Sequence, residues 1–304
     1  MAQKQTPIRL ILLYARPLEL LAGALMYALG AGLMVYLGNP LDWSRYFLGQ
    51  GCITLLQMSA YFLKSAFDLP PTRNSGIKGV ADENIRLQAS VISRSAVLLA
   101  AATTLTAGAV LTVILISENA LVTSGFLIIG VGVLLAVVYG APPFRLVYAG
   151  YGELILAFII ANLIPAFSFS LQAGELHRLL ALLTFPLTAL FLALQMAFSL
   201  PNYANDEHFS RKTMMVRLGW AHGMNLHNLL ILFSYLLLGA ATLLELPWAL
   251  LWPGLITLPI GIFQIWQMGR IAGGAKPNWT LLRATAAATF VLTAYFLAFA
   301  LWTA

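Results

Sequence analysis

Nine apolar segments, each about as long as a membrane-spanning helix, constrain this sequence more than any other feature. An α-helix needs about 20 apolar residues to cross the hydrocarbon core of a bilayer, and every segment is close to that length. Unpaired backbone groups are very costly in lipid, and the segments lack the short alternating pattern of barrel strands, so we predict helices. The segments cover residues 17–37, 46–67, 96–116, 121–139, 154–171, 179–200, 226–244, 248–266 and 281–302.

The overall composition excludes a soluble domain. Of the 304 residues, 60% are hydrophobic and only 9% are charged, whereas about a quarter of the residues in soluble domains are charged. The sequence therefore predicts an all-α polytopic membrane protein, in which residues 1–304 form one domain, a bundle of nine transmembrane helices. We expect an integral, multi-pass protein of a bacterial or archaeal plasma membrane, with an organellar membrane as the alternative.

The distribution of basic residues predicts the orientation of the bundle, because Lys and Arg collect in cytoplasmic loops. If the N-terminus is cytoplasmic, only Arg45 and Arg178 of the 17 Lys and Arg residues fall on the outer side. A missed or invented helix would weaken this asymmetry, so we predict nine crossings with a cytoplasmic N-terminus. The two longest loops, 68–88 and 201–223, are then both cytoplasmic and follow helices two and six.

The densest run of charge, residues 202–219, begins where the sixth apolar segment ends. It mixes carboxylates with cations: Asp206, Glu207, Arg211 and Lys212. A thinner cluster, residues 64–73, ends the second apolar segment, and in both clusters an aspartate precedes an arginine by five positions. We predict that the two clusters form one polar site at the cytoplasmic ends of helices two and six.

The loop after the fourth helix, residues 139–153, is expected at the same membrane face. Two consecutive prolines end the helix there, and Tyr139 and Arg145 flank them. An interfacial aromatic belt with an arginine that fixes topology would also explain these residues.

The residue types of these stretches suit a diphosphate. Carboxylates bind a hard cation such as Mg²⁺, and lysine and arginine neutralise phosphate directly, arginine with two parallel hydrogen bonds. The candidate metal ligands are Asp68, Asp206 and Glu207. The candidate phosphate ligands are Lys64, Arg73, Arg145, Arg211 and Lys212. Membrane topology and anionic lipid headgroups would account for any one cation, but they do not explain the carboxylates among them.

With these stretches the chain resembles the UbiA-type superfamily of intramembrane prenyltransferases. Residues 206–219, DEHFSRKTMMVRLG, are similar to the second aspartate-rich region of that family. Residues 139–153, YGAPPFRLVYAGYGE, are similar to its pattern of Tyr, Pro, Arg, Gly and Glu between helices four and five. Residues 64–73 lie at the position of its first aspartate-rich region. The resemblance covers nearly the whole chain.

The resemblance implies transfer of a prenyl group from an isoprenyl diphosphate to an aromatic or other lipophilic acceptor at the cytoplasmic membrane face, with Mg²⁺ as cofactor. Asp68 and Asp206 would be catalytic, and Asp68, Asp206 and Glu207 would bind the metal. The substrate-binding residues that it implies are Lys64, Arg73, Tyr139, Arg145, Asn202, Arg211 and Lys212. Membrane lipids are expected as further partners, and nucleic acid is not.

The aspartate-rich motifs depart from the family pattern. Where the family reads NDxxDxxxD, this chain reads KSAFDLPPT, which keeps Asp68 and places Lys64 at the Asn position. Where the family reads DxxxD, Asn202 replaces the first aspartate and Asp206 remains. Three of the five carboxylates are therefore missing, which favours one Mg²⁺ ion over two. Lys64 would then supply the positive charge of the other ion.

Two other functions are compatible with the sequence. A non-catalytic relative of the same fold would bind an isoprenoid or lipid diphosphate with cations in place of metals, and the degenerate motifs favour it. A transporter is less favoured, because few polar residues, such as Asn162 and Gln195, lie at mid-membrane depth.

Overall fold

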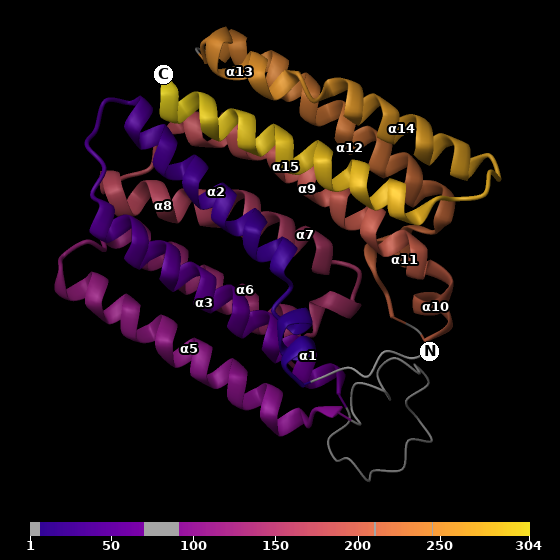
Figure 1. Cartoon of the computed structure of the whole chain (residues 1–304), viewed down its shortest axis with the longest axis horizontal. Helices are drawn as coiled ribbons and strands as arrows, with labels where there is room; N and C mark the ends of the chain where they lie inside the picture. Colours follow the sequence, from indigo (N-terminus) through magenta and orange to yellow (C-terminus); the bar gives the residue numbers. More distant parts are fainter. Residues whose placement is uncertain (1–6, 70–90, 210, 245) are drawn as a thin grey trace.

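The computed structural model describes residues 7–69, 91–209, 211–244 and 246–304, and within these ranges the chain is all-α (Figure 1). The long helices lie side by side in a bundle. The helices are α1 (Pro7–Tyr14), α2 (Pro17–Tyr36), α3 (Trp43–Asp68), α5 (Arg94–Ser117), α6 (Thr123–Gly140), α7 (Gly152–Phe158), α8 (Ile164–Ala173), α9 (Arg178–Ser199), α10 (Tyr203–His208), α11 (Met214–Leu218), α12 (Trp220–Ala240), α13 (Trp248–Leu255), α14 (Leu258–Ala272) and α15 (Trp279–Thr303). Shorter turns are η1 (Leu146–Tyr148), η2 (Ile159–Leu163), η3 (Leu200–Asn202) and η4 (Ala241–Leu244).

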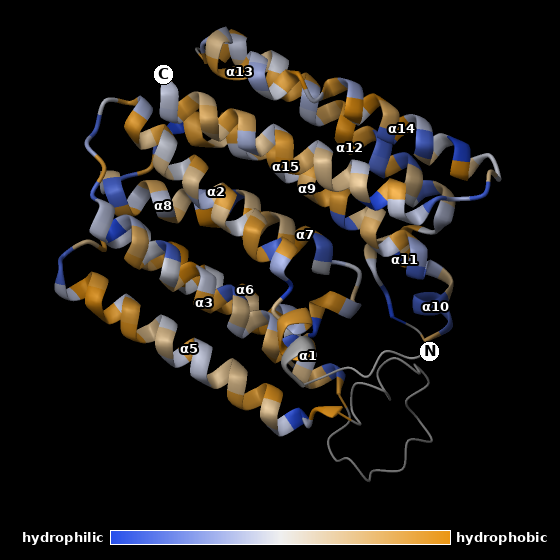
Figure 2. Ribbon diagram, viewed as in Figure 1, coloured by the Kyte–Doolittle hydropathy of each residue, from blue (hydrophilic) through white to orange (hydrophobic). Residues whose placement is uncertain are grey.

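Eight helical stretches of the described chain are long and apolar enough to cross a membrane. Apolar residues dominate these helices, and hydrophilic residues gather mostly at their ends and connections (Figure 2). The 26-residue helix α3 is not among the eight, and it carries Gln50, Gln57 and Lys64 between its apolar residues. The structure thus confirms an all-α polytopic membrane bundle. Nine crossings and a cytoplasmic N-terminus stay predictions.

Prolines explain where the observed helices depart from the predicted segments. In the structure the predicted segment 154–171 consists of two α-helices, α7 and α8, joined by the π-helical turn η2. This turn lies just before Pro165, whose ring nitrogen has no N–H to donate. Asn162 in this turn donates a hydrogen bond to Thr188 of α9. Helix packing therefore accounts for this mid-membrane asparagine. The predicted segment 248–266 is divided into α13 and α14, with Pro253 in the last turn of α13.

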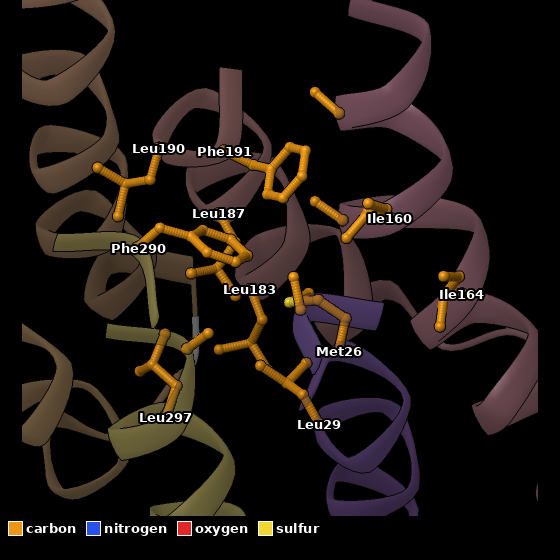
Figure 3. Packing of buried hydrophobic residues seen from close by; sticks show 14 of the residues in the cluster. Met26, Leu29, Ile160, Ile164, Leu183, Leu187, Leu190, Phe191, Phe290 and Leu297 are labelled. Atoms are coloured by element: carbon orange, nitrogen blue, oxygen red, sulfur yellow. The ribbon is translucent and has the colours of Figure 1, made fainter. Parts of the chain in front are cut away.

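The apolar core lies where α2, α9 and α15 meet, and side chains from these helices cluster there (Figure 3). Phe191 of α9 and Phe290 of α15 pack edge to face, with ring centroids 4.9 Å apart. Met26 of α2 and Leu187 of α9 are completely buried in the same cluster. This packing fixes α9, and with it the start of the polar stretch 202–219, relative to α2.

Helices α2 and α8 approach each other closely at Gly30. A Cβ atom added to Gly30 would overlap the carbonyl oxygen of Pro165 and would lie 2.8 Å from the Cα atom of that residue. Small residues permit such close approach between membrane helices, where dispersion contacts replace the hydrophobic effect as the packing force. Gly30 is therefore a packing requirement of the bundle.

Candidate functional site

Polar side chains gather at one end of the bundle around a pocket of about 310 Å³. The pocket lies at the end where α1, α10 and α11 are found, and the C-terminus lies at the other end (Figure 1). Its charged and polar wall residues are Arg16, Glu19, Lys64, Tyr139, Tyr148, Glu153, Gln195, Ser199, Asn202, Asp206, Arg211 and Thr213. The polar cluster at the end of α3 and the polar stretch 202–219, which follows α9, therefore meet in one pocket.

The carboxylate of Asp68, the last residue of α3, is bound by three side chains. Lys64, one turn earlier on the helix, places its Nζ 2.7 Å from Oδ2 of Asp68. Nη2 of Arg145 and the hydroxyl of Tyr148 each donate to Oδ1 at 2.8 Å. Burial alone would raise the pKa of Asp68, but the Lys64 ammonium and the hydrogen bonds outweigh burial and keep that pKa below its usual value. Asp68 is therefore a charged counter-ion of two cations.

Tyr148 lies at the centre of this arrangement, and sequence reasoning missed it. Three cationic groups approach its ring centroid: Nζ of Lys64 at 5.4 Å, and Cζ of Arg145 and of Arg211 at 5.1 and 5.8 Å. Burial, and then the charge of Asp68, raise the pKa of Tyr148 well above its ordinary value, so the phenol stays neutral and donates a hydrogen bond. Its only signal in the sequence is its place, three residues after Arg145.

A tight turn brings Arg145 within reach of Asp68. Helix α6 ends at Gly140, before the two prolines, and Arg145 itself has φ 41°, in the left-handed region that non-glycine residues seldom adopt. The N–H of Arg145 donates to the carbonyl of Ala141 at 3.0 Å, and the N–H of Tyr148 donates to the carbonyl of Arg145 at 2.9 Å. This turn therefore presents the side chains of Arg145 and Tyr148 to the same carboxylate.

Glu153 and Asp206 form an acidic part of the pocket wall. Oε1 of Glu153 accepts a hydrogen bond from the N–H of Met214 at 3.1 Å, whereas Oε2 is buried without a hydrogen-bond partner among the described residues. Asp206 of α10 is only 9% exposed, and its charge acts on Glu153. A buried carboxylate oxygen without a partner, beside a second carboxylate, is a place that favours a cation.

Backbone contacts join the loop 139–153 to the polar stretch 202–219. Ala149 and Lys212 form an isolated parallel bridge, and Nη1 of Arg217 donates to the carbonyl of Ala149 at 3.1 Å. The Arg217 guanidinium also lies 4.1 Å from the ring centroid of Tyr151. These contacts hold the acidic and the basic parts of the wall together.

Arg16 and Glu19 form a further charged pair at the beginning of α2, which sequence reasoning also missed. Nη1 of Arg16 donates to both carboxylate oxygens of Glu19, at 2.9 and 3.1 Å. The Arg16 guanidinium lies 5.5 Å from the ring centroid of Tyr61. A glutamate inside an otherwise apolar helix is the signal that could have drawn attention to this pair.

The pocket brings together most of the site residues predicted from the sequence. Those that line it are Lys64, Tyr139, Asn202, Asp206 and Arg211. Asp68 and Arg145 lie behind this lining: Asp68 hydrogen-bonds to the wall residues Lys64 and Tyr148, and the Arg145 side chain hydrogen-bonds to Asp68. Glu207 and Lys212 are exposed and lie outside its lining, and Arg73 lies outside the described residues.

The predicted metal ligands Asp68, Asp206 and Glu207 do not form one group. Within the described ranges, no three Asp, Glu, His or Cys side chains lie close enough together to hold a metal ion.

An apolar cavity of about 110 Å³ adjoins the polar pocket, between α3, α5, α6 and the stretch from α7 to α8. Tyr139 and Leu156 line both spaces. The remaining wall is almost entirely aliphatic, with Gln57 and Ser59 as its polar exceptions apart from tyrosines. A charged pocket and an apolar cavity that share a wall can accommodate the two ends of an amphipathic ligand.

Comparison with solved structures identifies the architecture. A UbiA homologue from Archaeoglobus fulgidus bound to GPP and Mg²⁺ matches with a TM-score of 0.60 at 16% identity, over 97% of this chain and 99% of that chain. This chain has the UbiA-type fold. A UbiA homologue from the same organism bound to DMAPP and Mg²⁺ matches with a TM-score of 0.59 at 16% identity, over 94% and 98% of the two chains.

A further solved structure that matches is that of a digeranylgeranylglyceryl phosphate synthase, with a TM-score of 0.60 at 12% identity over 93% of this chain and 91% of that chain. A further UbiA homologue structure from Archaeoglobus fulgidus holds Cd²⁺. No protein-family model and no curated protein sequence matches the chain. At these identities the likeness is one of fold, and it confirms the resemblance found in the sequence at that level.

Proposed function

We propose that this protein transfers a prenyl group from an isoprenyl diphosphate to an aromatic or other lipophilic acceptor. The observation that carries the proposal is the junction at Tyr139 and Leu156, where a pocket with both cationic and acidic side chains in its wall meets an apolar cavity. An isoprenyl diphosphate has two matching parts: an anionic head, which suits the cationic side chains of the pocket, and a hydrocarbon tail, which suits the apolar cavity. The UbiA homologues of this fold that hold GPP or DMAPP support the proposal.

In this reaction the bond between C1 of the prenyl group and the diphosphate oxygen breaks, and its electron pair leaves with the diphosphate. Lys64, Arg145 and Arg211 would stabilise the negative charge that develops there, because preorganised donors act strongly in a poorly hydrated site. The acceptor then forms a bond to C1 and loses a proton, which the released diphosphate can take up. The apolar cavity would hold the chain and keep water from the carbocation.

A divalent metal fits one part of this pocket better than the other. At the end of α3 both oxygens of Asp68 are already bound by side chains, whereas Glu153, whose environment Asp206 influences, keeps a buried oxygen without a hydrogen-bond partner in the described part of the chain. Mg²⁺ is commonly held by one or two carboxylates together with substrate phosphates. Glu153 and Asp206 would therefore hold a single ion, which when bound neutralises charge on the leaving diphosphate.

The test is release of diphosphate from GPP by the purified protein in lipid nanodiscs, with phenolic acids, naphthalenediols or glyceryl phosphates as acceptors. We expect one acceptor class to give a prenylated product, and we expect the Asp206→Ala variant to reduce its formation by about 10²-fold or more. Tight GPP binding without release, with every acceptor class, would contradict catalysis.

That second result would identify a non-catalytic protein that binds isoprenoid or lipid diphosphates. The ion pairs of Asp68 favour this alternative, because they hold Lys64 and Arg145 in position to bind phosphate without a metal ion. In both cases we propose that the site lies at the cytoplasmic face of a bacterial or archaeal plasma membrane, and the distribution of basic residues supports the choice of face.

Packing at Gly140 offers a further test of the site. A Cβ atom at Gly140 would lie 3.0 Å from the Cα and Cβ atoms of Lys64, so the Gly140→Val variant must displace Lys64 from the pocket. We expect product formation to fall by about 10²-fold, as misplacement of a binding group by about 1 Å can cause.

The matched control for this test is Gly130→Val, because a Cβ at Gly130 on the same helix meets no atom within 4 Å. Equal activity of the two variants would show that the close contact between α6 and Lys64 does not position the site.

A further inference from the structure

The position of Asp68 corresponds to a metal-binding region in the sequence resemblance, but its surroundings in this structure are those of a counter-ion. Oδ2 lies 2.7 Å from Nζ of Lys64, and Oδ1 accepts from both Arg145 and Tyr148 at 2.8 Å. A metal ion bound by either oxygen would therefore compete with a hydrogen bond and would be placed close to fixed positive charges. Like charges at such short distance repel strongly in a poorly hydrated site.

The cations beside Asp68 have N–H donors without a hydrogen-bond partner among the described residues. Nε of Arg145 is buried and has no hydrogen-bond partner among the described residues. The Lys64 ammonium has three N–H donors, and among the described residues it hydrogen-bonds to the Asp68 carboxylate and, at 3.5 Å, to the Tyr148 hydroxyl. A buried donor without a partner is costly, so these groups favour an anion with several acceptor oxygens.

The other charged residues of the pocket place that anion on the side of α3. Glu19 is paired with Arg16, and the carboxylates of Glu153 and Asp206 belong to the part of the wall that α7 and α10 form. An anion is repelled there unless a cation intervenes. The two parts of the wall thus differ in the way they can bind phosphate.

We infer that Lys64 and Arg145 bind the diphosphate directly, with Asp68 as their counter-ion and positioning residue rather than as a metal ligand. The inference rests on the proposed function for the identity of the ligand. Two side chains of the protein then supply the positive charge of one metal ion. A divalent ion would bind, if at all, at the part of the wall that Glu153 and Asp206 form.

The first experiment measures metal binding without reference to activity. Mn²⁺ is titrated into the protein with saturating GPP, and free Mn²⁺ is followed by electron paramagnetic resonance for wild type, Asp68→Asn and Asp206→Asn. We expect Asp68→Asn to keep the number of bound ions and to change their Kd by less than about threefold. A loss of one ion, or a Kd weakened by about tenfold or more in Asp68→Asn, would overturn the inference.

The second experiment measures GPP binding by isothermal titration calorimetry, with Mg²⁺ and with excess chelator. We expect wild type to bind GPP under both conditions, and Lys64→Asn to weaken binding by about tenfold or more in both. Lys64→Arg, which keeps the charge, should stay within about threefold of wild type with chelator. The control is Lys276→Asn, an exposed lysine on the loop before α15, and a melting curve of each variant confirms folding.

The outcomes separate the two proposals. GPP binding that requires Mg²⁺ and is unaffected by Lys64→Asn would overturn the direct contact and would leave the proposed function in place. Absence of GPP binding under every condition, in a protein that melts normally, would overturn both.

Discussion

Replacement of Arg145 by alanine is expected to lower prenyl transfer by about 10²–10³-fold, the usual effect of removing one preorganised donor from a site that stabilises developing negative charge. Nη2 of Arg145 holds Oδ1 of Asp68 at 2.8 Å and the carbonyl of Phe67 at 3.3 Å. Without the guanidinium, Asp68 keeps Lys64 and Tyr148 as its hydrogen-bonding side chains among the described residues, and the proposed diphosphate site loses one of its two cations. The measurement is kcat/KM for GPP with a saturating acceptor.

Two further variants separate the charge of Arg145 from its geometry. Arg145→Lys keeps the charge but loses the planar fork, and we expect it to recover only part of the activity. Arg270→Ala removes an exposed arginine near the end of α14 and is the matched control, which we expect to act like wild type. Activity of Arg145→Ala within about threefold of the control would contradict a role of this arginine in stabilising the leaving group.

The transmembrane helices could be predicted from the sequence because backbone N–H and C=O groups in lipid must be hydrogen-bonded within the protein, as they are in a helix. Every predicted apolar segment contains a helix in the structure, and the two segments that are divided into shorter helices have prolines near the division, Pro165 and Pro253. The meeting of the two polar clusters could also be predicted, since the distribution of Lys and Arg placed both at one membrane face. Lys64, Asp206 and Arg211 do line one pocket, and the membrane face at which this pocket lies stays a prediction.

The arrangement inside the pocket could not be predicted, because it depends on contacts between residues far apart in the chain. The Ala149–Lys212 bridge and the hydrogen bond from Met214 to Glu153 each join segments about 60 positions apart. No local pattern marks such pairs. Tyr148 was missed for the same reason, because two of the cations that approach its ring come from α3 and from the stretch after α10, far from Tyr148 in the sequence.

Asp68 illustrates how neighbours decide what a carboxylate does. The resemblance alone assigns this aspartate to metal binding, but a lysine one turn earlier occupies one of its oxygens. A spacing of four residues on a helix places the two side chains on the same face, so this ion pair could be predicted from the sequence. The engagement of the second oxygen by Arg145 and Tyr148 required the structure.

Replacement of Gly30 by alanine is expected to destabilise the bundle by about 1–3 kcal/mol or more, because the added Cβ overlaps the backbone carbonyl of Pro165. A side-chain neighbour could rotate away, but a backbone carbonyl moves only if α2 and α8 separate. The same substitution at Gly130 of α6 meets no atom within 4 Å. There, alanine should stabilise the helix by up to about 1 kcal/mol through its higher helix propensity.

Thermal unfolding of both variants in the same detergent measures the difference, with wild type as the reference. We expect the melting temperature of Gly30→Ala to fall and that of Gly130→Ala to stay level or rise. Because both substitutions change one glycine to alanine in a membrane helix, helix propensity contributes similarly to each, and the difference between them reports the close approach of α2 and α8. Equal melting temperatures would mean that the two helices can separate at little cost. The beginning of α2, which carries Arg16 and Glu19 into the pocket, would then not be held rigidly by this contact.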